Sequence, residues 1–344
     1  MGMEILEKDL KQYTTMKAKL ICGVTMLLAL CVVLMPYSVE AKVSRERKAN
    51  QLSNPKASPE ARKLFKELLS YHADGKILSG QMWAPWGIDE IEYVYKTTGK
   101  YPAVRGHDLI HERSNAREVE LLIEWYGKGG IPTLMWHWGA PTKGEGYEQS
   151  KMQIDIKQCF VEGTPENKAM WADLKRVAVW LKQLRDAKVP ILWRPMHECD
   201  GDWFWYGKGT GEDFVKLWRT MYDYFTHECG LDNLIWVVPH SDWIDPSYNP
   251  GREYYDLAGP DTYRKEWQGD LYKKIRNIYG EDNLIPLHEC GTIPDPDECK
   301  ANGTMWSWWM LWHTMHVTGH NKEDLRRIYN HEIVLTLDEL KRAK

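Results

Sequence analysis

Two short segments of the sequence each carry a glutamate at the end of an apolar run. Glu198 ends Pro-Ile-Leu-Trp-Arg-Pro-Met-His-Glu, and Glu289 ends Leu-Ile-Pro-Leu-His-Glu. A buried charge must be paired or have a function. In a retaining glycosidase, one carboxylic acid protonates the leaving oxygen and a second, ionised carboxylate attacks the anomeric carbon. The sequence therefore predicts a sugar hydrolase whose catalytic residues are Glu198 and Glu289.

Aromatic residues follow the first glutamate closely, in Asp-Trp-Phe-Trp-Tyr-Gly at 202–207. The whole chain has 18 Trp and 18 Tyr but only 5 Phe. Indole rings beside carboxylates suit a sugar, because C–H faces stack on the rings while the hydroxyls accept and donate hydrogen bonds. A tryptophan-rich core accounts for part of this excess. The net charge of −4 offers no basic surface for nucleic acid.

Other polar residues stand near the ends of the same apolar runs. Arg194 and His197 precede Glu198, and Asp261 lies in Pro-Asp-Thr-Tyr, where it could act as a third carboxyl or orient a neighbour. His137 lies in Trp-His-Trp and could reach a sugar hydroxyl. Strand alternation directs His197 into the barrel wall, although a bulge at the strand end would bring it into the site. His288 is interpreted as a structural hydrogen-bonding residue.

These residues require a scaffold in which many strand ends meet. Candidate strands alternate with helical stretches along the chain, which predicts a (β/α)₈ TIM barrel with its site at the carboxyl ends of the strands. The predicted strands are 77–81, 102–108, 131–138, 189–198, 234–239, 257–261, 284–289 and 305–312. The predicted helices include 58–71, 118–126, 171–187, 212–226, 271–279 and 323–329. Residues 139–168 are expected to form a loop over the site.

The N-terminal segment reads as a targeting signal rather than as part of the fold. Lys17 and Lys19 precede an apolar stretch at 20–36, and Ala41 marks a cleavage point. We expect a signal peptide at 1–41, with 1–15 as an upstream extension if Met16 is the start. An uncleaved anchor helix is the alternative. Residues 42–56 are expected to be a flexible leader and 57–344 a single catalytic barrel, in an exported monomer without a stable membrane span.

Five cysteines follow the predicted signal: Cys159, Cys199, Cys229, Cys290 and Cys299. An odd number leaves at least one thiol unpaired, and a Cys290–Cys299 bridge is left open. Cys199 and Cys290 come directly after the two glutamates, so alternation predicts that they pack away from the site. The His–Glu pairs lack the spacing of a helical zinc site, and we expect neither metal nor cofactor.

Residues 193–207, Trp-Arg-Pro-Met-His-Glu-Cys-Asp-Gly-Asp-Trp-Phe-Trp-Tyr-Gly, resemble the fourth-strand signature of glycoside hydrolase family 26. Residues 287–291, Leu-His-Glu-Cys-Gly, are similar to its seventh-strand segment, and 78–81, 136–138, 261–263 and 309–313 add support. The resemblance implies a retaining endo-β-1,4-mannanase acting on mannan, glucomannan or galactomannan. Glu198 would be its acid/base and Glu289 its nucleophile, with carboxyls about 5–5.5 Å apart.

The same resemblance implies roles for the residues around the glutamates. His197 would help to hold the acid/base, and Tyr263 would donate a hydrogen bond to the nucleophile. His137 and Trp312 would line the central sugar subsite, with Trp203 near the cleavage point. The chain departs from the family where Cys-Asp-Gly at 199–201 replaces Met-Asn-Gly, and where His288 replaces a small polar residue. Asp200 is expected to add negative charge near the acid/base and raise its pKa.

Three alternatives remain open at this point. The enzyme could act on another β-glycan, such as β-1,3-xylan or mixed-linkage glucan, or could be an exo-acting mannobiohydrolase. A non-catalytic glycan-binding barrel is the third, and two intact glutamates argue against it. The sequence leaves open whether 139–168 and 199–211 leave an open cleft or block one end.

Overall fold

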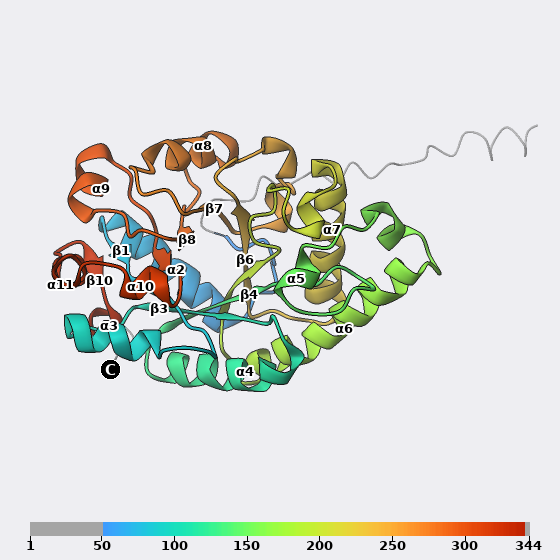
Figure 1. Cartoon of the computed structure of the whole chain (residues 1–344), viewed down its shortest axis with the longest axis horizontal. Coiled ribbons are helices and arrows are strands. Elements are labelled where there is room, and N and C mark those ends of the chain that lie inside the picture. The colour runs from blue at the N-terminus through green and yellow to red at the C-terminus, as the bar shows by residue number, and fades with distance from the viewer. Residues whose placement is uncertain (1–50, 341–344) are drawn as a thin grey trace, which may run out of the picture. The chain divides into compact units, whose positions relative to one another are not determined.

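The computed structural model describes residues 51–340, and eight of their strands form a closed parallel barrel with helices around it (Figure 1). This confirms the predicted TIM-barrel fold. The barrel strands are β2 (Gly80–Met82), β3 (Val104–Asp108), β4 (Ile131–Trp136), β5 (Ile191–Pro195), β6 (Leu234–His240), β7 (Leu257–Thr262), β8 (Leu287–Cys290) and β9 (Trp309–Leu311). The short strands β1 (Ile77–Leu78) and β10 (Val334–Leu335) pair with each other in a separate two-stranded sheet.

The helices lie in the connections between strands, except α2, which precedes the first strand. They are α2 (Pro59–Ala73), α3 (Glu90–Thr98), α4 (Glu112–Gly127), α5 (Tyr147–Ser150), α6 (Pro165–Asp186), α7 (Gly211–Asp223), α8 (Gly269–Tyr279), α9 (Pro296–Asn302), α10 (Met315–Thr318) and α11 (Lys322–Tyr329). A π-helical turn at Tyr224–Glu228 continues α7. Within residues 51–340, no helix is long and apolar enough to cross a membrane.

Two of the predicted strands are divided or shortened for a reason that lies in the backbone. The first, at 77–81, divides at Ser79, whose amide donates to Leu335 of β10 while Gly80 pairs with β3. The fourth stops at Pro195 rather than Glu198, because Met196 and Glu198 have φ angles of 54° and 51°. A strand cannot continue through residues with left-handed backbone.

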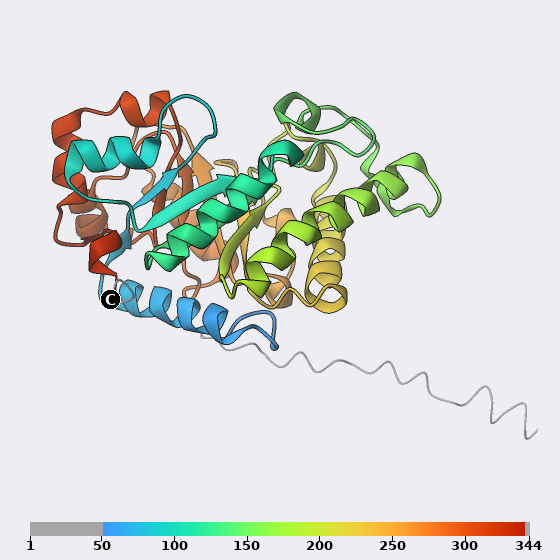
Figure 2. The ribbon, with the colours of Figure 1, turned by 90° about the horizontal axis from the view of Figure 1, so that it is seen from below.

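The barrel interior is filled with apolar side chains and is closed at the amino ends of the strands by α2. Ser58 caps this helix by accepting a hydrogen bond from the Ala61 amide, and Pro59 occupies its first position. Figure 2 shows α2, in blue, running past one end of the strands. Side chains from α2 and from the strand starts form one buried cluster, which includes Ala61, Leu64, Leu68, Val104, Ile131, Leu192, Ile235 and Leu257. The other end of the barrel is left for the site.

Residues 51–56, which we expected to belong to a flexible leader, pack on the barrel instead. Leu52 is buried in the cluster around α2, and the Ser53 amide donates to the Asp256 carboxylate at 2.5 Å. That part of the prediction was wrong, because a polar composition concealed one buried apolar side chain and one backbone anchor. Residues 42–50 and the predicted signal peptide at 1–41 lie outside the described residues.

The segment 139–168 is more ordered than a loop. It contains α5 and a 3-10 turn at Ile156–Phe160, and α6 begins within it because Thr164 caps the Asn167 amide. Gly139 lies against the Gly144 carbonyl, where a Cβ would come within 1.9 Å of the oxygen. The segment therefore folds back on itself and brings Tyr147 to the carboxyl ends of the strands.

Candidate active site

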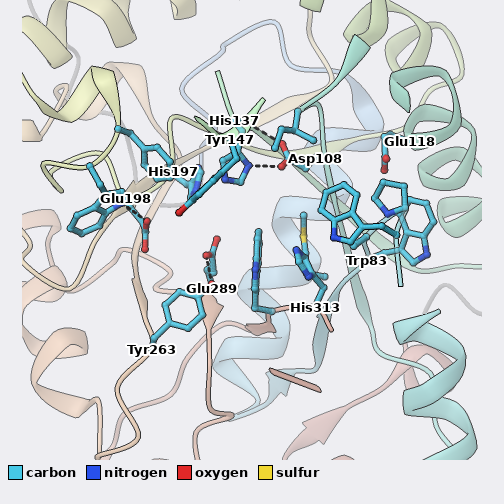
Figure 3. A pocket seen from close by; sticks show the side chains of 18 residues that line it. Trp83, Asp108, Glu118, His137, Tyr147, His197, Glu198, Tyr263, Glu289 and His313 are labelled. Atoms are coloured by element: carbon cyan, nitrogen blue, oxygen red, sulfur yellow. Dashed lines mark hydrogen bonds and ion pairs between the residues drawn. The ribbon is translucent and has the colours of Figure 1, made fainter. Parts of the chain in front are cut away.

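A cavity of about 490 Å³ lies at the carboxyl ends of the barrel strands (Figure 3). It brings together seven residues singled out from the sequence: His137, His197, Glu198, Trp203, Tyr263, Glu289 and Trp312. The remaining two, Arg194 and Asp261, are buried beneath it and bonded to Glu289 or to each other. The structure thus places all nine in one neighbourhood.

Glu198 reaches the cavity through a tight turn after β5. Its own left-handed φ and that of Met196 turn the chain so that His197 and Glu198 both line the cavity. The His197 ring packs on Phe204, with centroids 4.6 Å apart, and its carbonyl accepts a hydrogen bond from Tyr206. Strand alternation therefore does not govern these residues. Such backbone angles cost roughly 1–3 kcal/mol each and are found most often at functional sites.

Glu289 is held on both of its oxygens. Oε2 accepts from Arg194 Nη2 at 2.8 Å, and Oε1 accepts from the Tyr263 hydroxyl at 2.6 Å. A register shift between β8 and β9 occurs at Leu287–Cys290. At this shift, the neighbouring residues His288 and Glu289 both face Arg194, and His288 Nδ1 lies 3.3 Å from Arg194 Nη1.

Arg194 links the carboxyls beneath the cavity. It is 3% exposed and donates through Nη1 to Asp261 at 2.7 Å as well as to Glu289. Asp261 also lies 2.5 Å from His288 Nδ1. A buried guanidinium is stable only when its charge and donors are matched, as here. Asp261 and His288 therefore orient Arg194, which is the structural role expected of His288.

The two glutamates have different electrostatic surroundings. Burial and the negative charges of Glu289 and Asp261 raise the pKa of Glu198 to about 9. The Glu198 carboxyl is bonded by the indole of Trp203, whose Nε1 lies 2.5 Å from Oε2. Burial and Asp261 also raise the pKa of Glu289, but Arg194 and Tyr263 act in the opposite direction. Because the cation contacts Glu289, a proton shared by the pair resides on Glu198.

The carboxyls are close to one another. One oxygen from each of Glu198, Asp261 and Glu289 lies within 4.8 Å of the other two. Figure 3 shows the Glu198 and Glu289 carboxyl groups pointing into the same space, with Tyr263 beside Glu289. A proton donor and a proton-free carboxylate thus face a region where one glycosidic bond could sit.

His137 lines the cavity from the end of β4, and Asp108 holds it there. The Asp108 carboxylate accepts from the His137 amide at 3.0 Å and also bonds its Nδ1. The His137 ring meets those of His197 and Trp312, with centroids 4.2 and 6.4 Å apart. Burial, together with the nearby His137 and Arg194, holds the pKa of His197 well below its usual range, so this ring is neutral.

Several residues that line the cavity were missed in the sequence. Asp108 ends a predicted strand just as Asp261 does, and that signal could have identified it. His313 follows Trp312, and burial lowers its pKa to about 4. Trp83 and Tyr147 come from connections whose path no local pattern specifies.

Asp200 does not act on Glu198 as expected. Its carboxylate is fully buried and faces the end of β6, where it accepts from His240 Nδ1 at 2.6 Å and from Ser241. The raised pKa of Glu198 comes from burial, Glu289 and Asp261 instead. The prediction was wrong because it assigned an orientation to a side chain in a turn.

The cysteines of residues 51–340 are unpaired thiols, and one of them lies beside an aspartate and a histidine. All five cysteines in 51–340 are free, and burial raises the thiol pKa of both Cys199 and Cys290. Cys290 Sγ contacts the Met310 carbonyl, in keeping with a packing residue. Cys199, Asp200 and His240 bring ligand atoms within 4.8 Å of one another, but Asp200 and His240 already bond each other.

Relatives named as mannan endo-1,4-beta-mannosidases share the sequence over most of this chain. Mannan endo-1,4-beta-mannosidase from Thermothelomyces thermophilus is 31% identical over 314 residues, covering 84% of this chain and 63% of that protein. Mannan endo-1,4-beta-mannosidase B from Piromyces sp. is 32% identical over 311 residues, covering 84% of this chain and 53% of that protein. The chain therefore spans between half and two thirds of the length of these relatives.

A solved structure matches over nearly its full length. The β-mannanase from a symbiotic protist of the termite Reticulitermes speratus, complexed with gluco-manno-oligosaccharide, superposes with a TM-score of 0.76 at 29% identity. The match covers 85% of this chain and 98% of that one. Residues 53–339 match the sequence profile of Glycosyl hydrolase family 26. With its barrel, its paired glutamates and this match over the whole described domain, the chain belongs to glycosyl hydrolase family 26.

Proposed function

We propose that this protein is a retaining endo-β-1,4-mannanase acting on mannan, glucomannan or galactomannan. The observation that carries the proposal is the unequal pair of carboxyls: Glu289 is bonded to a guanidinium, while Glu198 has a pKa raised to about 9. One carboxyl oxygen of Glu198 lies within 4.8 Å of one of Glu289, closer than the separation that leaves room for a water in an inverting enzyme. Relatives named as mannan endo-1,4-beta-mannosidases supply the substrate class.

The mechanism takes place in two displacements. Glu289 attacks the anomeric carbon as Glu198 protonates the departing oxygen, so the glycosidic bond breaks and a glycosyl-enzyme ester forms. Glu198, now ionised, then takes a proton from water, whose oxygen attacks the anomeric carbon and releases Glu289. Arg194 and Tyr263 keep Glu289 ionised and aimed before attack, and they stabilise the carboxylate again when it leaves.

The aromatic and histidine side chains around the pair bind the sugar. Trp203 holds the Glu198 carboxyl through its indole N–H while lining the cavity near the cleavage point. His137, fixed by Asp108, and Trp312 flank the central sugar on the other side of Glu289. His197 contributes a neutral ring whose packing on Phe204 supports the turn that carries Glu198.

Cleavage within the chain is supported by a second cavity. A space of about 320 Å³ shares Glu198, Trp203 and Tyr263 with the first and extends to Asp242 and Arg264. Glu198 therefore borders two adjoining spaces, which could take sugars on either side of the scissile bond. An exo-acting enzyme would need one side blocked.

The test is hydrolysis of linear mannan, galactomannan, xylan and mixed-linkage glucan at equal mass concentration. A site built to bond one hydroxyl leaves buried polar groups unpaired when an epimer binds, so we expect mannans to react at least about a hundredfold faster. A mixture of oligosaccharides early in the reaction supports endo action, and mannobiose alone would indicate an exo enzyme. A faster reaction on xylan or glucan would contradict the assignment of mannan as the substrate. Binding without cleavage would indicate a lectin.

We further propose that the protein is exported, as a secreted, periplasmic or surface enzyme. Lys17, Lys19 and the apolar stretch at 20–36 support this proposal, because polysaccharides are too large to enter a cell. Fractionation of the native host with antibody against the barrel tests it, and a protein found wholly in the cytoplasm would contradict it.

A further inference from the structure

The residue two positions after Glu198 has an environment that specifies a carboxylate rather than an amide. Asp200 Oδ1 accepts from the Ser241 amide and hydroxyl, each at 2.7 Å. Oδ2 accepts from the Asp245 amide at 2.7 Å and from His240 Nδ1 at 2.6 Å. Every partner is a donor, and an ionised carboxylate is the side chain that only accepts.

The same pattern fixes the His240 tautomer. Its Nδ1 must carry the proton that Asp200 accepts, so Nε2 of the neutral ring accepts from the Tyr279 hydroxyl at 2.6 Å. Asp200, His240 and Tyr279 therefore form a directional chain of hydrogen bonds, and all three are buried. An asparagine at this position, as in the usual family pattern, would point its NH₂ group at two donors.

This cluster joins the two loops that border the cleavage point. Asp200 belongs to the β5 loop, in which the Gly201 amide donates to the Glu198 carbonyl at 3.0 Å and Trp203 bonds the Glu198 carboxyl. Ser241 begins the β6 loop, and its hydroxyl accepts from the amide of Trp243, whose ring lies 5.5 Å from that of Trp203. The carboxylate of Asp200 thus holds the β6-loop backbone on both sides of Trp243, through the amides of Ser241 and Asp245.

We propose that Asp200 is a positioning residue for Glu198. By fixing the β5 loop to the β6 loop, Asp200 keeps the acid/base carboxyl of Glu198 directed at the leaving oxygen. The proposal rests on the proposed function, in which Glu198 is the acid. It gives the aspartate a role that is geometric rather than electrostatic. Burial raises the pKa of Asp200, but the bonds from His240, Ser241 and Asp245 outweigh it and keep the group ionised.

The experiment compares two substrates in the Asp200→Asn variant. Mannan needs a proton on its leaving oxygen, whereas a dinitrophenyl β-mannobioside does not, and kcat/KM reports the first displacement for both. We expect kcat/KM to fall about tenfold or more on mannan, ~1.4 kcal/mol, and to stay within about twofold on the aryl substrate. Asp202→Asn, the same change at an exposed position of the same loop, should alter neither.

A compensating change provides the rescue. In the Asp200→Asn, His240→Asn double variant, the amide introduced at position 200 has an NH₂ group that needs an acceptor. The amide oxygen introduced at position 240 supplies that acceptor, where His240 Nδ1 had been a donor. We expect it to recover part of the loss on mannan, and His240→Asn alone to keep most of the activity. If Asp200→Asn does not fold, Tyr279→Phe provides a second test, because it removes the hydrogen bond to His240 Nε2. We expect kcat/KM to fall more on mannan than on the aryl substrate, by a smaller factor than in Asp200→Asn.

Equal losses on both substrates, or no loss on mannan, would overturn the positioning role. A wrong substrate assignment gives a different result, because it appears in the wild-type enzyme as failure to cleave mannan. The comparison is then made on whichever glycan the wild type does cleave and on its aryl glycoside.

Discussion

The guanidinium of Arg194 and the carboxylate of Glu289 form a buried ion pair, with Nη2 2.8 Å from Oε2 and both side chains 3% exposed. The same guanidinium bonds Asp261 through its other terminal nitrogen. Glu198 lacks such a cation, and this difference separates the roles of two glutamates that the sequence presents in similar contexts. The asymmetry of the site is therefore set by an arginine four residues before Glu198.

Replacing Arg194 with Met should remove most activity and shift its pH dependence. Without the cation the pKa of Glu289 rises, so the acidic limb of kcat/KM moves to higher pH. Loss of one partner from a buried pair costs about 3–5 kcal/mol, which should also lower Tm. Arg117→Met, at an exposed ion pair, is the control and should change Tm little. An unmoved acidic limb would contradict the assignment of Glu289.

Glu198→Ala should separate substrates by leaving group. Hydrolysis of mannan should be lost, whereas the first displacement on a dinitrophenyl β-mannobioside should survive because that leaving group needs no proton. Glu289→Ala should abolish the reaction of both substrates while oligosaccharide binding remains. Kinetics on both substrates and calorimetry measure these effects. If Glu198→Ala loses similar activity on the two substrates, the assignment of Glu198 as the acid is wrong.

Stability should depend on pH through Glu198. Its pKa is about 9 in the folded protein, above its ordinary value of 4.5, so the folded state holds a proton that the unfolded state releases. This contribution is complete below the unfolded pKa, declines as pH rises through the window from about 4.5 to 9, and is lost above it. Glu198→Gln cannot ionise, so its Tm should fall less than that of the wild type between those limits. Parallel Tm curves would contradict the raised pKa.

The indole N–H of Trp203 lowers the pKa of Glu198 by donating to the carboxylate. Trp203→Phe removes that donor and keeps an aromatic ring. The alkaline limb of kcat/KM, which reports loss of the acid's proton, should therefore move to higher pH. Trp205→Phe is the matched control, because its N–H bonds the Trp138 carbonyl away from the glutamates. A limb that moves equally in both variants would mean that the effect is general.

Trp312 should act as a sugar platform rather than as core. Trp312→Ala should lower kcat/KM on mannan at least about tenfold, roughly 1.4 kcal/mol of transition-state binding. Trp312 is partly buried and its ring lies 4.6 Å from that of His313, so a modest fall in Tm is expected. A large fall in Tm with unchanged kinetics of the folded fraction would assign Trp312 to the core.

The fold could be predicted because periodic patterns are local. Alternation of apolar runs with amphipathic stretches identified the eight barrel strands, and Ser58-Pro59 marked the start of α2. The strand ends were less accurate, since the left-handed φ of Met196 has no sequence signature in a residue that is not glycine. The same limit explains why the alternation rule was a poor guide to His197.

The site could be predicted where a residue follows its own strand. Glu289 and Asp261 lie at such ends, and Asp108 could have been found in the same way. Tyr147 and Trp83 could not, because their places depend on how long connections fold over the barrel. Asp200 was misjudged for a related reason: its proximity to Glu198 along the chain says nothing about the donors of β6 that surround it.

The left-handed backbone at Glu198 lowers the stability of the fold at the same position whose side chain is needed for activity. A side chain with a Cβ is disfavoured at φ 51°, and glycine is not. Selection for heat resistance alone should therefore favour Glu198→Gly, which relaxes the turn and removes a half-buried carboxyl while destroying turnover. Thermostable variants of this enzyme are better sought among residues of α2 and the helical shell, where gains in packing do not compete with the chemistry.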